Sequence, residues 1–150
     1  TRVSCIYTWY IYCMSENTNK SRILIVDDDI DLASLYKMRL TTEGYDVIHS
    51  ANSETALQTA REFLPDLIIL DLMMPRVSGF DAIDLFRNTA ETKHAKIVIM
   101  SALSQPEDIQ RTKELGADDY IIKSNFTINE VVMRIKQVLG DTQEPIPEST

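Results

Sequence analysis

Charged and hydroxyl side chains stand at the ends of apolar runs at several points in this sequence, and their types suit phosphoryl chemistry. The residues that share this placement are Asp27, Asp28, Asp71, Ser101 and Lys123. Apolar runs such as 67–70 predict strands buried on both faces, as in a parallel sheet covered by helices. Open α/β sheets bind ligands at the carboxyl ends of such strands. We therefore expect these side chains to share one pocket.

Three carboxylates in one pocket are costly unless a cation is also present. By type, Asp27 and Asp28 would hold Mg²⁺, and Asp71 would attack a phosphorus atom to become an acyl phosphate. Lys123 would help neutralise the phosphoryl oxygens, and Ser101 would donate a hydrogen bond to one of them. Each residue alone has an ordinary interpretation, such as a turn former, a strand-end hydroxyl or a solvated lysine. Their joint placement favours the reactive site.

Strands and helices are expected to alternate from residue 22 onward. The expected strands are 22–27, 45–48, 66–71, 96–101 and 119–123. A helix follows each strand, with apolar residues at helical spacing. Five such βα units predict an α/β fold in which helices cover both faces of a parallel sheet.

Apolar spacing and capping residues predict which side of each helix faces inward and where it begins. The inward positions are Leu32, Leu35, Tyr36 and Leu40 in the first helix, Ala56, Leu57, Ala60 and Leu64 in the second, Ile83 and Phe86 in the third, and Ile128, Val131, Val132, Ile135, Val138 and Leu139 in the last. Asn52 or Ser53 caps the second helix. The segment 104–107 (Ser-Gln-Pro-Glu) predicts a capping box for the fourth.

Length and composition fit one ordinary domain. The chain has 150 residues, of which 44% are hydrophobic, a formal charge of −8 and a pI near 4.7. This charge argues against direct binding to nucleic acid or an anionic membrane. The two cysteines, Cys5 and Cys13, form no metal-binding pattern. Both lie outside the expected core, which therefore holds no disulfide, as fits a cytoplasmic protein.

The domain itself is expected over residues 22–140. Residues 1–13 hold both cysteines and the single tryptophan, and we interpret them as an upstream or non-native extension in preference to an added edge strand or docking segment. Residues 14–21 form a polar leader, and 141–150 an acidic linker or tail.

Four pieces of the sequence resemble the receiver domain of bacterial two-component response regulators. They are Ile-Leu-Ile-Val-Asp27-Asp28-Asp29, Leu-Ile-Ile-Leu-Asp71-Leu-Met-Met-Pro75 with Ser78-Gly79, Ile-Val-Ile-Met-Ser101-Ala102, and Gly116-Ala-Asp-Asp-Tyr120-Ile-Ile-Lys123. Their spacing is that of the family, and the resemblance covers residues 22–140. It implies a flavodoxin-like, doubly wound sheet of five parallel strands in the order 2-1-3-4-5, with five helices in three layers.

The resemblance also implies a role for each site residue. Asp71 would accept phosphate from a sensor histidine kinase or phosphotransfer protein. Asp28, Asp71 and the backbone carbonyl of Met73 would ligate Mg²⁺, for which Mn²⁺ could substitute, while Asp27 would act largely through water. Ser101 and Tyr120 would be the switch residues, and the surface of the fourth helix, fifth strand and fifth helix would change. The chain would catalyse only its own phosphorylation and dephosphorylation.

Two features leave alternatives open. The family usually has a cis-linked proline after the strand-five lysine, whereas Ser124 follows Lys123 here. This bond is therefore trans, or the loop carries the roughly 2.5–4 kcal/mol cost of a cis non-proline bond. Residues 116–120 with Arg134 resemble a subclass that forms homodimers through the fourth helix, fifth strand and fifth helix, but solvated surface charges explain them equally well.

Two rival functions deserve comparison with the receiver. A haloacid dehalogenase-like phosphohydrolase also uses an aspartate nucleophile and Mg²⁺, but it generally needs a second aspartate two residues later, where this chain has Met73. A phosphorylation-independent interaction module would not need Asp71 and Lys123. Both comparisons favour the receiver.

Overall fold

The computed structural model describes residues 20–141. The predictions made for residues 1–13 and for the tail beyond Asp141 lie outside this range, as does most of the predicted polar leader. Within it, α-helices and β-strands alternate along the chain, as the sequence predicts.

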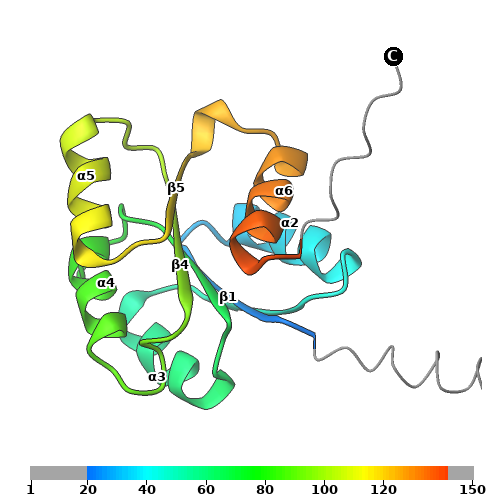
Figure 1. The fold of residues 1–150 in the computed structure, drawn as a ribbon, viewed down its shortest axis with the longest axis horizontal. Coiled ribbons are helices and arrows are strands. Elements are labelled where there is room, and N and C mark those ends of the chain that lie inside the picture. Colours follow the sequence, from blue (N-terminus) through cyan, green and yellow to red (C-terminus); the bar gives the residue numbers. More distant parts are fainter. Residues whose placement is uncertain (1–19, 142–150) are drawn as a thin grey trace, which may run out of the picture.

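Five parallel strands form a single sheet in the order β2-β1-β3-β4-β5 (Figure 1). The strands are β1 (Arg22–Val26), β2 (Asp46–Ser50), β3 (Leu67–Leu70), β4 (Lys96–Ser101) and β5 (Asp119–Ile122). The side chains of the central strands β1 and β3 are buried on both faces, except for that of Arg22 at the start of β1. This burial explains why their sequences are continuous apolar runs.

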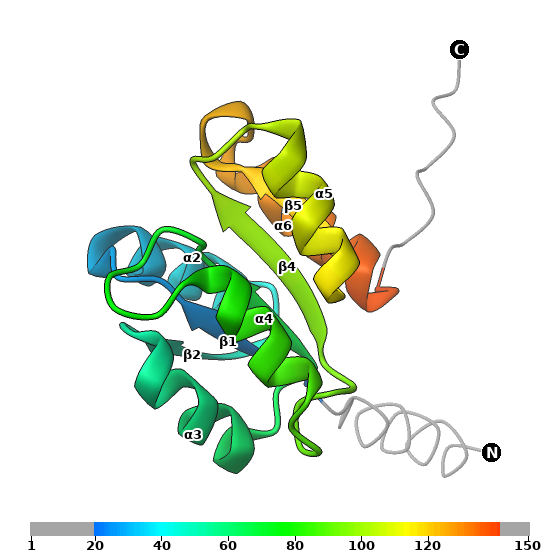
Figure 2. The same ribbon diagram turned by 90° about the vertical axis from the view of Figure 1, so that its left-hand side faces the viewer.

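Five α-helices within residues 20–141 cover the sheet on both faces and complete three layers (Figures 1 and 2). They are α2 (Ile30–Thr42), α3 (Ser53–Phe63), α4 (Gly79–Arg87), α5 (Pro106–Leu115) and α6 (Ile128–Leu139). One core cluster joins α2 and α6 to the sheet, and the other lies between the sheet and α3, α4 and α5. None of these helices is long and apolar enough to cross a membrane. The predicted fold and strand order are confirmed.

Helix starts follow local capping chemistry. Asn52 caps α3 by accepting a hydrogen bond from the backbone of Thr55, which decides between the two expected caps. Thr127 and Glu130 form a reciprocal capping box at the start of α6. The capping box predicted at 104–107 is wrong. Gln105 is the residue that precedes α5, with no side-chain cap, and Pro106 occupies the first turn.

Two predicted inward residues face solvent instead. Leu35 is exposed because the buried stripe of α2 passes through Ala33, Tyr36 and Leu40, so that the small Ala33 occupies the inward position. Leu64 is half exposed, since it is the C-cap of α3 and adopts a left-handed backbone with φ 53°. The end of the helix therefore turns this side chain out of the helical register.

The loop after β5 takes the first of its two predicted forms. No cis peptide bond occurs among residues 20–141, so Lys123 and Ser124 are joined in trans. A short 3₁₀ turn, η1 (Lys123–Asn125), follows β5 directly and leads through Phe126 to α6. Where the family usually has a loop with a cis-proline, this chain therefore has a 3₁₀ turn that begins at Lys123.

Candidate active site

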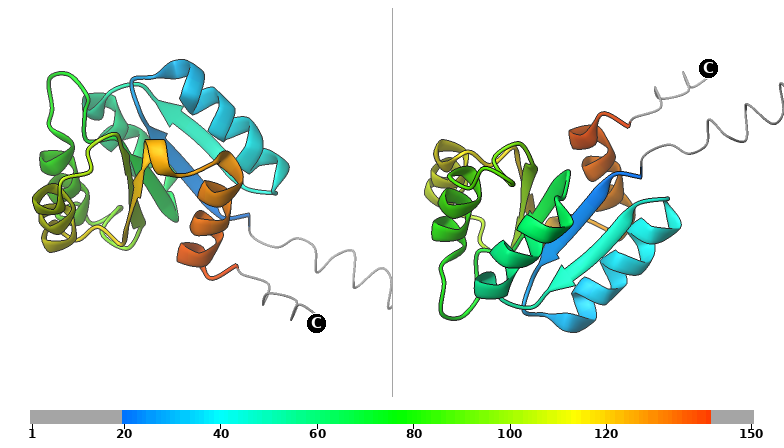
Figure 3. Two further views of the ribbon diagram at one scale, coloured as in Figure 1. Left: turned by 90° about the horizontal axis from the view of Figure 1, so that it is seen from above. Right: turned by 90° about the horizontal axis from the view of Figure 1, so that it is seen from below.

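The predicted acidic residues meet at the carboxyl ends of β1 and β3, which are neighbours in the sheet. Asp27, Asp28 and Asp71 each offer a carboxylate oxygen, and these three atoms lie within 4.8 Å of one another. Asp27 and Asp71 are buried, whereas Asp28 is exposed. Figure 3 (left) looks onto this edge of the sheet from above. The cluster therefore has two buried members and one that opens to solvent.

Lys123 reaches this cluster from the end of β5. Its Nζ donates to Asp27 Oδ2 at 2.9 Å and to Asp71 Oδ2 at 3.1 Å. The backbone N–H of Asp29 also donates to Asp27 Oδ1 at 2.9 Å. One ammonium group is thus shared by two buried carboxylates.

Burial and charge act in opposite directions on this pair. Burial raises the pKa of the Asp27 carboxyl above its ordinary value, and the hydrogen bond from Lys123 offsets only part of that rise. Burial alone would lower the pKa of Lys123, but its hydrogen bonds to Asp27 and Asp71 raise it overall. The ammonium form of Lys123 is therefore favoured, while burial disfavours the charged form of Asp27.

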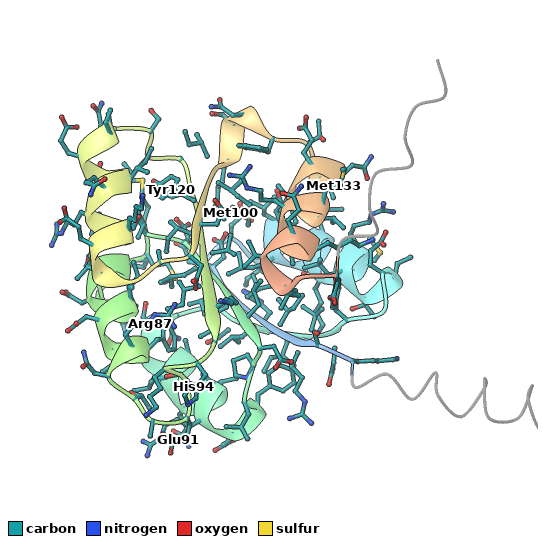
Figure 4. All side chains as sticks on the ribbon, viewed as in Figure 1. Arg87, Glu91, His94, Met100, Tyr120 and Met133 are labelled. Carbon is teal, nitrogen blue, oxygen red and sulfur yellow. The ribbon has the colours of Figure 1, made fainter. Side chains whose placement is uncertain are left out.

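Ser101 and Tyr120 reach the same edge through the loop that follows β4. Ser101 is fully buried, and its Oγ accepts a hydrogen bond from the backbone N–H of Leu103 at 3.3 Å. Tyr120 Oη donates to the carbonyl oxygen of Leu103 at 2.7 Å. In Figure 4, Tyr120 lies between β5 and α5. Both predicted switch residues thus hold one loop residue, Leu103.

Two interactions fix the loop after Asp71: a hydrogen bond to the Asp71 carboxylate and close packing of Gly79. The backbone N–H of Met73 donates to Asp71 Oδ1 at 3.0 Å, while the Met73 side chain is 57% exposed. Gly79, the first residue of α4, packs directly behind: a Cβ placed there would lie 2.4 Å from Leu72 Cα and 2.9 Å from the carbonyl oxygen of Asp71. Only glycine permits this approach. The backbone itself therefore forms the wall behind Asp71.

The donor set fits a small, hard cation. Mg²⁺ takes oxygen ligands and keeps several waters, so one or two carboxylates and a carbonyl group suffice to hold it. Asp28, Asp71 and the carbonyl oxygen of Met73 are the groups that would bind it. The single ammonium of Lys123 leaves the three carboxylates with a surplus of negative charge. That surplus favours a divalent ion.

Several contacts made by residues in and around the site could not be predicted from the sequence. The motif containing Gly79 is visible there, but its contact with the backbone behind Asp71 is not. His49, at the end of β2, lies beside the backbone of Asp27. Arg134 pairs with Asp119 within the same chain. Contacts between distant strands depend on the fold, so single-residue patterns could not reveal them.

Comparison with known proteins identifies the family. Residues 23–136 match the model of the response regulator receiver domain, which covers well over half of the chain. The chain belongs to this family. The predicted resemblance is therefore confirmed.

Among curated relatives, the chain is similar to full-length regulators. It is 37% identical over 124 residues to the transcriptional regulatory protein ResD of Bacillus subtilis, covering 83% of this chain and 50% of that protein. It is 38% identical over 120 residues to the DNA-binding response regulator MtrA of Mycobacterium bovis, covering 80% and 51%. The chain thus spans about half the length of the curated relatives it matches.

Solved structures show the same fold. The chemotaxis protein CheY4 of Vibrio cholerae matches with a TM-score of 0.75 and 28% identity, covering 79% of this chain and 98% of that one. A CheY-like receiver domain protein from Methanospirillum hungatei matches with a TM-score of 0.75 and 25% identity, covering 81% and 95%.

Proposed function

We propose that Asp71 accepts a phosphoryl group from a phosphohistidine of a sensor kinase or phosphotransfer protein, in a reaction that requires Mg²⁺. The observation that carries this proposal is the Lys123 ammonium, held between Asp27 and Asp71 beside the exposed Asp28. This arrangement places positive charge next to a nucleophilic carboxylate at an open edge of the sheet.

In the proposed reaction, an oxygen of Asp71 attacks phosphorus, and the bond from phosphorus to the histidine nitrogen breaks. The products are an acyl phosphate on Asp71 and a free imidazole on the donor. Lys123 follows the negative charge by turning its Nζ from Asp71 to the new phosphoryl oxygens. Bound Mg²⁺ would supply further positive charge for those oxygens.

Phosphorylation would change the surface formed by α5, β5 and α6. The hydroxyl of Ser101 would leave the N–H of Leu103 to donate to a phosphoryl oxygen, and the loop held by Tyr120 would shift with it. The change is a bias on two pre-existing conformations, caused by new charge at one end of the sheet. Residues 116–120 and Arg134, which resemble a subclass that forms homodimers, lie on this surface, so this is where a homodimer would form.

The experiment is phosphorylation with acetyl phosphate and Mg²⁺, followed by intact-mass measurement. One phosphoryl adduct is expected on the parent chain and none on Asp71→Asn, which keeps the shape of the side chain but loses the nucleophile. Omission of Mg²⁺ should suppress the adduct. Equal labelling of both chains would refute the assignment of Asp71.

The rival activities are less well supported. Met73 occupies the position where a phosphohydrolase of the haloacid dehalogenase type generally has its acid, and its side chain cannot transfer protons. We therefore propose that the chain turns over only its own phosphoryl group. The net charge of −8 supports a domain that does not itself bind nucleic acid. The relative MtrA, whose name describes it as DNA-binding, is about twice as long as the stretch that matches this chain. A cytoplasmic location is proposed because residues 22–140 contain no cysteine for a disulfide.

A further inference from the structure

β2 contributes a side chain to the peptide that links two of the acidic residues. β1 and β2 pair in register up to Val26 and Ser50, and the N–H of Asp27 donates to the carbonyl oxygen of Ser50 at 3.2 Å. In a continuing parallel ladder, the carbonyl of Asp27 would next accept a hydrogen bond from the N–H of Asn52. Instead, β2 ends at Ser50, and Asn52 turns away to cap α3.

The imidazole of His49 takes the place of that backbone donor. Its Nε2 lies 2.7 Å from the carbonyl oxygen of Asp27. A carbonyl oxygen only accepts hydrogen bonds, so Nε2 carries the hydrogen in this contact. The half-buried His49 ring thus prolongs the β1–β2 ladder by one hydrogen bond.

This hydrogen bond bears on Asp28 more than on Asp27. The Asp27 side chain already has two other partners, Lys123 and the N–H of Asp29. For Asp28, the hydrogen bonds and ion pairs within residues 20–141 include none to the carboxylate, which is exposed. The direction of that carboxylate depends on its backbone, and the carbonyl of Asp27 belongs to the same peptide plane as the nitrogen of Asp28.

We propose that His49 is a positioning residue for the metal ligand Asp28, acting through the peptide between Asp27 and Asp28. Its Nε2–H holds the plane of that peptide, which aims the Asp28 carboxylate at the cluster with Asp71. This inference rests on the proposed Mg²⁺-dependent function. It adds a contribution from the edge strand β2, which supplies none of the groups expected to touch the metal or the phosphoryl group.

The test is titration of the purified chain with MgCl₂ by calorimetry, which reads metal affinity independently of phosphorylation. His49→Leu keeps a side chain of similar bulk without a donor, and His49→Gln places an amide N–H at a similar reach. We expect roughly tenfold weaker binding for His49→Leu, the low end of the effect of outer partners on metal sites. His49→Gln should recover most of the affinity.

His94→Gln provides the matched control, because His94 is the only other histidine and lies near Arg87 and Glu91, toward the end of the molecule opposite η1 (Figure 4). If His49→Leu does not fold, His49→Val, with a strand-forming side chain, replaces it. Urea unfolding of each variant shows whether a loss of affinity is separate from a loss of stability.

Each outcome bears on a different claim. Parent-like affinity in both His49→Leu and His49→Gln would overturn the positioning role. Equal weakening in both variants would overturn the hydrogen bond as its cause. If the parent chain itself binds no Mg²⁺, the proposed function fails before the role of His49 is reached.

Discussion

Two charged clusters lie at opposite edges of the sheet, and they are built in different ways. At the carboxyl edge, Lys123 faces Asp27 and Asp71, with Asp28 beside them. At the amino edge, Arg87 at the end of α4 extends into the turns that precede β4 and β5, low in the view of Figure 4. Both clusters join segments that are distant in sequence.

The guanidinium of Arg87 has an acceptor for every N–H group. Nε and Nη2 donate to the carbonyl oxygen of Gly116, Nη1 donates to those of Lys93 and Ala95, and Nη2 also donates to Asp118 Oδ2 at 2.8 Å. Asp118 Oδ2 in turn accepts from the N–H of Ile97. This cluster is complete in hydrogen bonds, and its one carboxylate has two cationic neighbours, because Lys96 Nζ also lies 3.9 Å from Asp118 Oδ1.

The cluster at Lys123 is incomplete by the same measure. The cluster has three carboxylates but one ammonium, which contacts only Asp27 and Asp71, and the burial of Asp27 is only partly compensated. A complete network stabilises the fold and has no need of a further ligand. An incomplete one, with surplus negative charge, is destabilised until a cation binds. The contrast separates a structural cluster from a reactive one, and the following changes test it.

The largest effect is expected from Arg87→Ala, which should lower the free energy of unfolding by about 2–3 kcal/mol. The change leaves Asp118 without its main partner and several carbonyl groups without donors. Urea unfolding measures this loss. Arg87→Lys keeps the charge but not the five-donor geometry, so its free energy of unfolding should lie between those of the parent and Arg87→Ala. Phosphorylation of folded Arg87→Ala should persist. If Arg87→Ala unfolds with the same free energy as the parent, the Arg87 cluster does not stabilise the fold and the proposed contrast is wrong.

Within the reactive cluster, Asp28→Ala and Lys123→Ala should separate metal binding from the response to phosphorylation. Asp28→Ala should weaken Mg²⁺ binding by more than about tenfold because it removes a direct ligand. Lys123→Ala should leave that affinity largely intact but blunt the structural response. Calorimetric titration with Mg²⁺ ranks the two variants. The reverse ranking would show that the two roles are exchanged.

A smaller, several-fold effect is expected on the lifetime of the acyl phosphate. Hydrolysis needs a water molecule aligned with phosphorus, and Met73 and Leu103 cannot hold one by strong hydrogen bonds. The parent should therefore decay slowly in Mg²⁺ buffer, and Met73→Asn and Leu103→Glu should each accelerate the decay. Intact-mass measurement over time follows it. Rapid decay of the parent, unchanged in both variants, would contradict this.

The smallest effect is a pH dependence of stability that comes from Asp27. Because burial raises the pKa of this carboxyl, the folded chain binds its proton more tightly than the unfolded chain. Its contribution to the free energy of unfolding therefore falls as pH rises from the ordinary aspartate pKa through the raised one.

In Asp27→Asn this contribution disappears. Without divalent metal, the unfolding free energy of the variant minus that of the parent should rise with pH across the window and then level off. Urea unfolding of both chains, at a series of pH values from about 4 to 7, measures the difference. A difference that falls with pH would mean that Lys123 outweighs burial.

The parts predictable from sequence are those set by local patterns. Apolar runs predict the central strands. Because all strands are parallel, the polar residues at their carboxyl ends meet at one edge, which predicts the reactive cluster. The inward side of α2 is harder to predict, because its buried stripe includes the small Ala33 and leaves the larger Leu35 exposed. The roles of Arg87 and His49 could not be predicted, because their partners come from segments that meet only after folding.

The tight approach of Gly79 to the backbone around Asp71 has a consequence for genetics. Defects caused by a bulky residue in a core are often rescued when a neighbouring side chain becomes smaller. At Gly79, an added methyl group would meet Leu72 Cα, the Asp71 carbonyl oxygen and Leu72 Cδ2. A smaller residue at position 72 would remove only the last of these, because the other two belong to the backbone. A selection for second-site suppressors of Gly79→Ala should therefore recover revertants far more often than compensating mutations.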